Sequence, residues 1–175
     1  MSVDRVALRP VAEDDLPVME RFLSDRETAE PFQRFGWWDT RRRRRQWAEH
    51  GLLTDDAGQL MVVRDDERLG FVSWRKIAFG RPSYYWNMGI GLLPEARGKG
   101  VGTEAQRQLV EYLFAHTLVP RIEADTEVGN IAEQRALEKA GFTREGVLRS
   151  VVFRDGGWRD LVRYSILRDD LHPPH

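Results

Sequence analysis

The chain has 175 residues, 41% hydrophobic and 31% charged, which fits a single globular domain, residues 1–175, with a substantial core. Its 27 basic and 28 acidic residues leave a net charge of −1, so the average surface offers no long-range attraction to nucleic acid or to an anionic membrane. The absence of cysteine excludes disulfides and thiol nucleophiles. No apolar run approaches the roughly 18 residues of a membrane span, and we expect a cytoplasmic protein without a membrane partner.

The N-terminal part of the chain predicts a strand followed by two helices. Residues 3–10 alternate apolar and polar side chains, as a half-buried strand does, and residues 13–24 carry their apolar side chains at helical spacing. After a loop rich in aromatic residues, Asp39 or Thr40 is a suitable N-cap for a second helix that reaches Gly51.

Five consecutive arginines, residues 41–45, open that second helix. Successive residues on a helix are rotated by about 100°, so the five side chains cannot form one flat patch. Three interpretations remain open: a solvated and partly salt-bridged helix face, a site for an anionic substrate or for the phosphates of a cofactor, and a nucleic-acid contact.

The middle of the chain predicts an antiparallel meander followed by a helix. Residues 60–64, 69–79 and 84–93 are rich in β-branched and aromatic side chains and are separated by turn residues, which is typical of three consecutive strands. Residues 103–117 then place apolar side chains on one helical face.

The C-terminal part predicts a strand, a helix and a hairpin. Residues 121–127 form the strand, and residues 131–140 form a helix that Gly141 ends as a C′ glycine. The segment 145–168 reads as two strands around a turn at Asp155, where the sequence Asp-Gly-Gly demands positive φ.

A glycine-rich turn, Arg-Gly-Lys-Gly-Val-Gly at residues 97–102, precedes the helix at 103–117. Glycines allow backbone N–H groups to converge, and the helix N-terminus and two cations favour an anion. The spacing G-x-G-x-G differs from the dinucleotide fingerprint, and no G-K-[ST] follows, so NAD and a P-loop nucleotide are disfavoured. A pyrophosphate is the expected ligand, and an ordinary turn is the alternative.

Three motifs in order resemble the GNAT acyltransferases. Residues 97–102 match the acetyl-CoA loop R/Q-x-x-G-x-G/A, residues 130–142 resemble N-x-x-S-x-R-x-L-E-K-x-G-F, and the C-terminal hairpin is similar to the branch that contains RimJ and RimL. The resemblance implies an α+β (α/β/α) GNAT fold: a mixed, mostly antiparallel sheet of about seven strands, splayed between strands four and five, with about four flanking helices.

The resemblance also implies acetyl-CoA as co-substrate and an amine as acceptor. Backbone groups of the fourth strand would pair with the pantetheine arm beside a β-bulge that Gly89 and Gly91 would suit, with packing as the alternative role of these glycines. The expected cofactor-binding residues are Gly91, Leu92, Leu93, Arg97, Gly98, Lys99, Gly100, Val101, Gly102, Thr103 and Asn130.

The catalytic groups are less clear, because positions at which relatives carry an acid or a base hold other residues. Leu137 stands where many GNAT enzymes have a tyrosine, Glu133 where RimL has a serine, and Val152 where RimL has a glutamate. The Leu92 N–H is the expected oxyanion donor. Glu133, Asp125 and Tyr164 are candidate proton-transfer groups. Their structural alternatives are, respectively, a first-turn helix carboxylate favoured by the dipole, a solvated strand residue and a core tyrosine. Catalysis by positioning with a water relay is a further possibility.

The acceptor is expected to be a primary amine of a small molecule or of a peptide N-terminus. Six aromatic residues are candidates for its pocket, with core packing or a homodimer contact as the alternative: Phe32, Phe35, Trp37, Trp38, Tyr85 and Trp86. The histidine spacing indicates no metal site. Two rival functions are a catalytically silent acyl-CoA sensor and a nucleic-acid-binding module.

Overall fold

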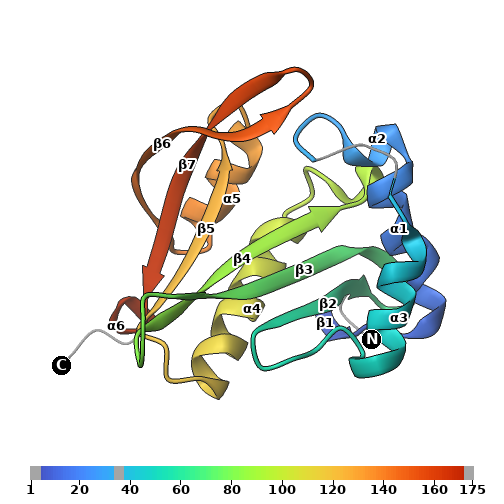
Figure 1. The fold of residues 1–175 in the computed structure, drawn as a ribbon, viewed down its shortest axis with the longest axis horizontal. Coiled ribbons are helices and arrows are strands. Elements are labelled where there is room, and N and C mark those ends of the chain that lie inside the picture. The colour runs from blue at the N-terminus through green and yellow to red at the C-terminus, as the bar shows by residue number, and fades with distance from the viewer. Residues whose placement is uncertain (1–4, 34–37, 172–175) are drawn as a thin grey trace.

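The computed structural model describes residues 5–33 and 38–171, which form a seven-stranded sheet with helices on both faces (Figure 1). The strand order is β1-β2-β3-β4-β5-β7-β6, and only β4 and β5 run parallel. The strands are β1 Val6–Pro10, β2 Ala57–Arg64, β3 Glu67–Ala78, β4 Tyr84–Leu92, β5 Arg121–Glu127, β6 Thr143–Arg154 and β7 Gly157–Leu167. The helices are η1 Glu13–Asp15, α1 Leu16–Ser24, α2 Arg26–Ala29, α3 Thr40–His50, η2 Pro94–Ala96, α4 Val101–His116, α5 Ile131–Lys139 and α6 Arg168–Leu171.

The predicted mixed sheet is confirmed, as are the antiparallel meander of β2, β3 and β4 and the C-terminal hairpin. Asp155 and Gly156 occupy the hairpin turn at φ of 49° and 74°, the positive values that the sequence demanded. The helix α4 begins at Val101, earlier than predicted, because Gly100 caps it in a left-handed conformation. The short helices α2 and α6 were not predicted.

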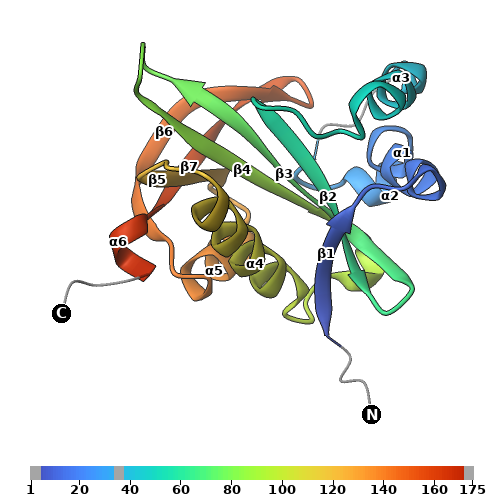
Figure 2. The ribbon, with the colours of Figure 1, turned by 90° about the horizontal axis from the view of Figure 1, so that it is seen from below.

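The helices divide between the two faces of the sheet. Figure 2 shows α4 and α5 on one face and α1 and α3 on the other. Alternate strand residues point to opposite faces, and β4 illustrates this: Trp86 and Met88 are buried in the core beneath α4. A second apolar cluster with Leu16, Met19 and Met61 lies beneath α1.

The strands β4 and β5 are joined over a short stretch and then diverge. Residues 86–88 of β4 pair with residues 122–124 of β5, and beyond Met88 and Ala124 no further pairs form between these two described strands. Figure 1 shows the two strands running apart toward α2 and the β6–β7 hairpin. The expected splay is therefore present, but the β3–β4 ladder is continuous from Gly70–Leu92 to Ala78–Tyr84, so no bulge lies in it at Gly89 or Gly91.

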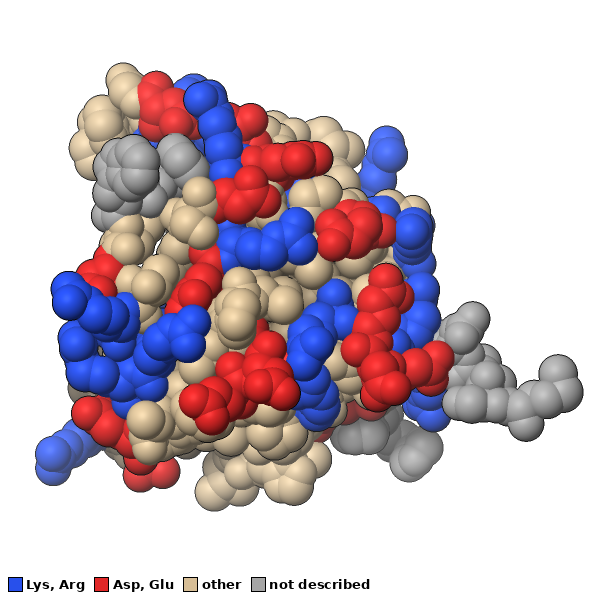
Figure 3. Space-filling view, turned by 90° about the vertical axis from the view of Figure 1, so that its right-hand side faces the viewer, with Lys and Arg blue, Asp and Glu red and all other residues tan. Residues whose placement is uncertain are grey.

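The arginine run forms the first turns of α3, and Asp39 caps this helix as predicted by accepting from the Arg41 N–H. Arg44 forms a two-pronged ion pair with Glu20 of α1, at 2.7 and 2.9 Å. Figure 3 views this side of the molecule and shows acidic and basic side chains interspersed across it. These contacts support the salt-bridged interpretation of the run.

Candidate active site

A pocket of about 470 Å³ opens where β4 and β5 separate. Its walls come from four parts of the chain: residues 29–33 of α2 and the loop after it, Ile90 and Leu92 of β4, the glycine turn with the start of α4, and one face of α5. The pocket therefore joins the segments that carry the sequence motifs.

The glycine turn presents backbone N–H groups to this pocket. Gly98 and Gly100 have φ of 73° and 76°, values that strain any other residue, and no heavy atom lies within 4 Å of a Cβ built at either position. The first helical bond of α4 runs from the Glu104 N–H to the Gly100 carbonyl at 3.2 Å, so the N–H groups of residues 101–103 precede it and remain available. An open cradle with these donors fits a pyrophosphate.

The side chains of this segment divide between the pocket and the core. The pocket is lined by Arg97, Gly98, Gly100, Gly102 and Thr103, and their role in binding the cofactor stays a prediction. Val101 is 1% exposed and packs into the core, so only its N–H can serve a ligand.

The cations near the turn differ from the prediction. Arg97 does not point to the cradle: its guanidinium donates to the carbonyls of Leu92, Glu30 and Thr28, at 3.0, 3.0 and 2.6 Å. Lys99 is not among the pocket-lining residues, whereas Arg135 and Lys139 of α5 are.

The two α5 cations were missed, although the sequence held a signal for them. With Ala132 and Ala136 they repeat at i, i+3, i+4 and i+7, which places all four residues on one helix face. That face lines the pocket.

The backbone of β4 presents further N–H donors to the pocket. The Leu93 N–H donates to the Leu69 carbonyl at 2.9 Å, and Gly91 pairs with Phe71, so odd-numbered residues direct their polar groups toward β3. By alternation, the N–H groups of Ile90 and Leu92 face the gap that β5 has left. Leu92 thus has the predicted orientation, Ile90 was missed, and the predictions of cofactor pairing by the N–H groups of Gly91 and Leu93 are corrected.

Gly91 has a packing role. A Cβ at this position would lie 2.7 Å from the ring of Phe71 and 3.1 Å from that of Phe22. These two rings form an edge-to-face pair with centroids 5.0 Å apart. The structural alternative for this glycine is therefore supported.

Two polar side chains at the start of α5 reach the pocket. Asn130 caps the helix by accepting from the Glu133 N–H at 3.3 Å. Glu133 also lines the pocket, and its carboxyl accepts from the amide of Gln106, which is fully buried in α4. Burial raises the pKa of Glu133 to about 7, although the Gln106 hydrogen bond opposes this shift.

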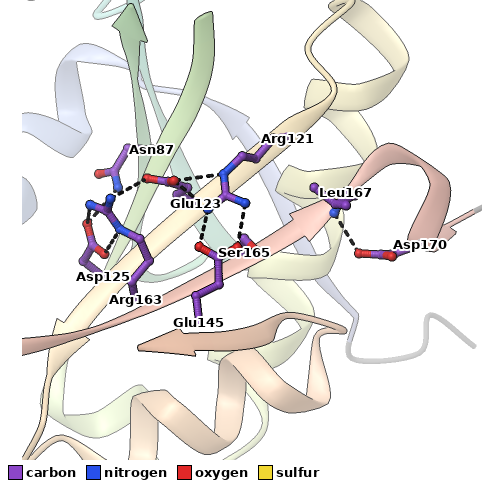
Figure 4. Close-up of polar contacts among 9 residues, drawn as sticks. All are labelled: Asn87, Arg121, Glu123, Asp125, Glu145, Arg163, Ser165, Leu167 and Asp170. Carbon is purple, nitrogen blue, oxygen red and sulfur yellow. Dashed lines mark hydrogen bonds and ion pairs between the residues drawn. The ribbon is translucent and has the colours of Figure 1, made fainter. Parts of the chain in front are cut away.

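Asp125 lies just beyond the last β4–β5 pair but is already engaged. Arg163 donates to both of its carboxylate oxygens, at 2.9 and 3.0 Å, and Asn87 donates to one of them at 3.1 Å (Figure 4). The residue therefore is not the solvated strand residue of the structural alternative. Its carboxylate anchors β7 to β5 and β4.

The side chain of Tyr164 points to the face of the sheet opposite to that of its neighbour Arg163. It is fully buried among core residues, and its hydroxyl donates to Glu138 of α5 at 2.9 Å. It does not line the pocket. Its contacts support the expected alternative, a core tyrosine.

The predicted acceptor aromatics are dispersed. Phe32 lines the main pocket and also a smaller one of about 320 Å³, which it shares with the β6–β7 hairpin. Trp86 is 4% exposed and belongs to the core, so its assignment to the acceptor pocket was wrong. Tyr85 points to the other face, where its ring stacks on Phe79. Trp38 is half exposed, and the predicted Phe35 and Trp37 lie outside the described residues.

The described residues contain neither a membrane-spanning helix nor a metal-binding cluster. Between residues 5 and 171, leaving out 34–37, no helix combines the length and apolar character that crossing a membrane requires. The same residues contain no group of three or more histidine or acidic side chains arranged to hold a metal ion.

Comparisons with known proteins identify the family. The model of the acetyltransferase (GNAT) domain matches residues 5–143. A probable N-acetyltransferase of Bacillus subtilis, YjcK, is 37% identical over 111 residues, which are 63% of this chain and 61% of that protein. An aminoglycoside N(6′)-acetyltransferase type 1 of Klebsiella pneumoniae is 29% identical over 164 residues, 84% of this chain and 78% of that protein.

The fold also agrees with a solved structure. RimJ of Mycobacterium smegmatis, determined in complex with CoA-disulfide, superposes with a TM-score of 0.77 at 24% identity, covering 95% of this chain and 84% of RimJ. With the family match over residues 5–143 and the splayed, glycine-bordered pocket, this chain belongs to the GNAT acetyltransferase family.

Proposed function

We propose that this protein transfers the acetyl group of acetyl-CoA to a primary amine. The observation that carries the proposal is one pocket with two sets of free backbone donors, those of the glycine turn and α4 and those of Ile90 and Leu92. The family supports the donor, and relatives named as N-acetyltransferases support the reaction.

Acetyl-CoA supplies an activated thioester, and the chain's residues bind and polarise it. The N–H groups of residues 101–103 hold the pyrophosphate, with Arg135 and Lys139 adding positive charge from α5. The amide of Asn130, at the pocket wall, is placed for the cofactor's arm. The Leu92 N–H stabilises negative charge on the acyl oxygen, because this donor is fixed by the strand before the reaction begins.

Glu133 is the proposed proton donor to the departing thiolate. It lines the same pocket, and a pKa of about 7 leaves a large protonated fraction at neutral pH. The Oε1 atom of Gln106 is buried and has no hydrogen-bond partner among the described residues, so a protonated Glu133 can also donate to it if the amide turns. The amine itself loses its proton to water, since Asp125 and Tyr164 are held by other residues.

The acceptor enters between Phe32 and the β6–β7 hairpin. The smaller pocket there is also lined by Glu127, Arg154, Arg159 and Asp160. Glu127 and Arg154 form a two-pronged ion pair at 2.9 and 2.7 Å, and the Asp160 carboxylate accepts the Ser150 N–H at 2.8 Å. Asp160 is the proposed partner of the acceptor's ammonium group, on a small molecule or on a peptide N-terminus.

The test is thiol release from acetyl-CoA in the presence of amines of different classes: peptides with free N-termini, polyamines, aminoglycosides and amino acids. We expect thiol release with at least one class, at a rate well above acetyl-CoA hydrolysis. Tight acetyl-CoA binding without turnover on any of them would favour the silent sensor instead. Oligonucleotide binding that falls steeply with salt and is lost when residues 41–45 are neutralised would favour the nucleic-acid module.

A further inference from the structure

Arg97 joins three segments that meet beside the pocket. It follows η2 and precedes the glycine turn, and its side chain crosses to α2 and back to β4. Two of its hydrogen bonds reach the carbonyls of Thr28 and Glu30, at the C-terminal end of α2. The third reaches the Leu92 carbonyl.

Each of these carbonyls lacks an ordinary partner. The last carbonyls of a helix have no N–H in the next turn, and a cation placed there is favoured by the helix dipole. The Leu92 carbonyl faces the gap between β4 and β5, where no strand partner is available. The planar guanidinium satisfies all three at fixed angles, which an ammonium on a flexible stem cannot do.

The segment that Arg97 holds, residues 28–33, lies between the proposed acetyl-CoA pocket and the proposed acceptor pocket. Residues 29–33, directly at and after α2, line the main pocket, and Phe32 also lines the smaller one. Arg97 also donates to the carbonyl of Leu92, whose N–H is the proposed oxyanion donor. Arg97 therefore links the acceptor wall to the strand end that carries this donor.

Resting on the proposed function, we propose that Arg97 is a positioning residue that fixes the acceptor wall to the oxyanion end of β4, and is not a ligand of the pyrophosphate. Its position in the glycine motif and in the pocket wall suggests a phosphate contact, but its guanidinium donates its hydrogen bonds to three backbone carbonyls. Its loss would displace Phe32 and Leu92 while the glycine cradle stays intact.

The decisive experiment separates the two halves of the cofactor. Calorimetry with 3′-phospho-ADP, which carries the pyrophosphate without the thiol arm, is performed on Arg97→Gln and, as the matched control, on Arg135→Gln. We expect Arg97→Gln to keep its affinity within about threefold, and Arg135→Gln to lose about tenfold, as for one charged hydrogen bond. An Arg97→Gln loss equal to or larger than that of Arg135→Gln would overturn the proposal.

A kinetic arm uses acetyl-CoA and acetyl-pantetheine with the amine found in the panel. Arg97→Gln is expected to lower kcat/KM with both thioesters by the same factor, about tenfold or more, and to raise the KM of the amine. A loss confined to acetyl-CoA would contradict the positioning role.

Arg97→Lys separates the role of the charge from that of the planar fork, because lysine keeps the charge and lacks the fork. We expect it to behave like Arg97→Gln in amine KM, and recovery of wild-type KM by lysine would contradict the role of the fork. If the wild-type protein turns over no amine, the proposed function fails, and the binding of 3′-phospho-ADP still decides the role of Arg97.

Discussion

The two ends of the proposed active site, the donor pocket and the acceptor pocket, are built from different parts of the polypeptide. In the donor pocket, the groups proposed to bind are backbone N–H groups, presented by left-handed glycines, a helix start and a strand without a neighbour. In the proposed acceptor pocket, the walls are side chains of Phe32 and of the β6–β7 hairpin. A backbone site is specific for a shared donor, whereas a side-chain site can change its acceptor without disturbing the fold.

The family match follows the same division. It covers residues 5–143 and so includes the glycine turn, β4 and α5, while nearly all of the β6–β7 hairpin lies beyond it. The following experiments test whether the two ends can be changed independently.

The largest effect is expected from filling the donor cradle. Replacing Gly102 with leucine should weaken acetyl-CoA binding at least about 100-fold, because the added side chain extends from the pocket-lining start of α4. Gly102→Ala is the matched control: its Cβ would lie 3.5 Å from Leu92 and 3.9 Å from Ile90, which are ordinary contacts. Calorimetry that finds wild-type affinity in the leucine variant would show that the pyrophosphate lies elsewhere.

The second effect concerns proton transfer between the two ends. Glu133→Gln should lower kcat by roughly 100-fold, the usual contribution of a general acid. With an acceptor that stays deprotonated over the range studied, wild-type kcat should fall as the pH rises through about 7, since Glu133 then loses its proton. The glutamine variant should lack this decline. A pH profile that is unchanged by the substitution would exclude Glu133 as the acid.

A smaller and selective effect is expected at the acceptor wall. Phe32→Ala should raise the amine KM by about tenfold, because an aromatic wall shared by both pockets is lost. The acetyl-CoA dissociation constant should change by less than about threefold. Equal losses for both substrates would show that the two ends are not separable at this residue.

The smallest effect concerns the stability of the hairpin side. Glu145 of β6 accepts from Arg121 and from Ser165, and the Arg121 hydrogen bonds lower the Glu145 pKa to about 2 (Figure 4). A lowered folded-state pKa stabilises the protein above the ordinary value of 4.5, and this contribution is lost as the pH falls toward 2.

Glu145→Gln should therefore lower Tm at neutral pH by about 2–4 °C, corresponding to at most about 1 kcal/mol for a carboxylate that is 37% exposed. The difference between the two proteins should shrink on acidification, as measured by thermal unfolding at several pH values. A constant difference down to pH 2 would contradict the assignment.

The fold was largely predictable, because local sequence patterns determine most of its elements. The meander, the Asp39 cap of α3 and the Asp155 turn each follow from residue types at fixed spacing. Adjacent strand residues point to opposite faces, so Tyr85 and Trp86 could not both face the acceptor, and the alternation alone could have excluded one of them.

The site was predictable where it depends on backbone and not where it depends on side-chain direction. Glycine spacing located the cradle, but nothing in the sequence states that Arg97 turns back to three carbonyls or that Asp125 is held by Arg163. Such contacts depend on partners distant along the chain, as Thr28 is from Arg97.

The short β4–β5 joint also bears on local opening of the sheet. Within the described residues, the strands β1 to β4 form one paired group and β5, β7 and β6 form another, and the two groups share backbone pairs only at residues 86–88 and 122–124. Backbone pairing is thus extensive within each group and short between them, so we expect the sheet to open first at this joint. Amide exchange at this joint would therefore report the opening of the sheet between two cooperative units, and the proposed entry for acetyl-CoA lies at the boundary between them.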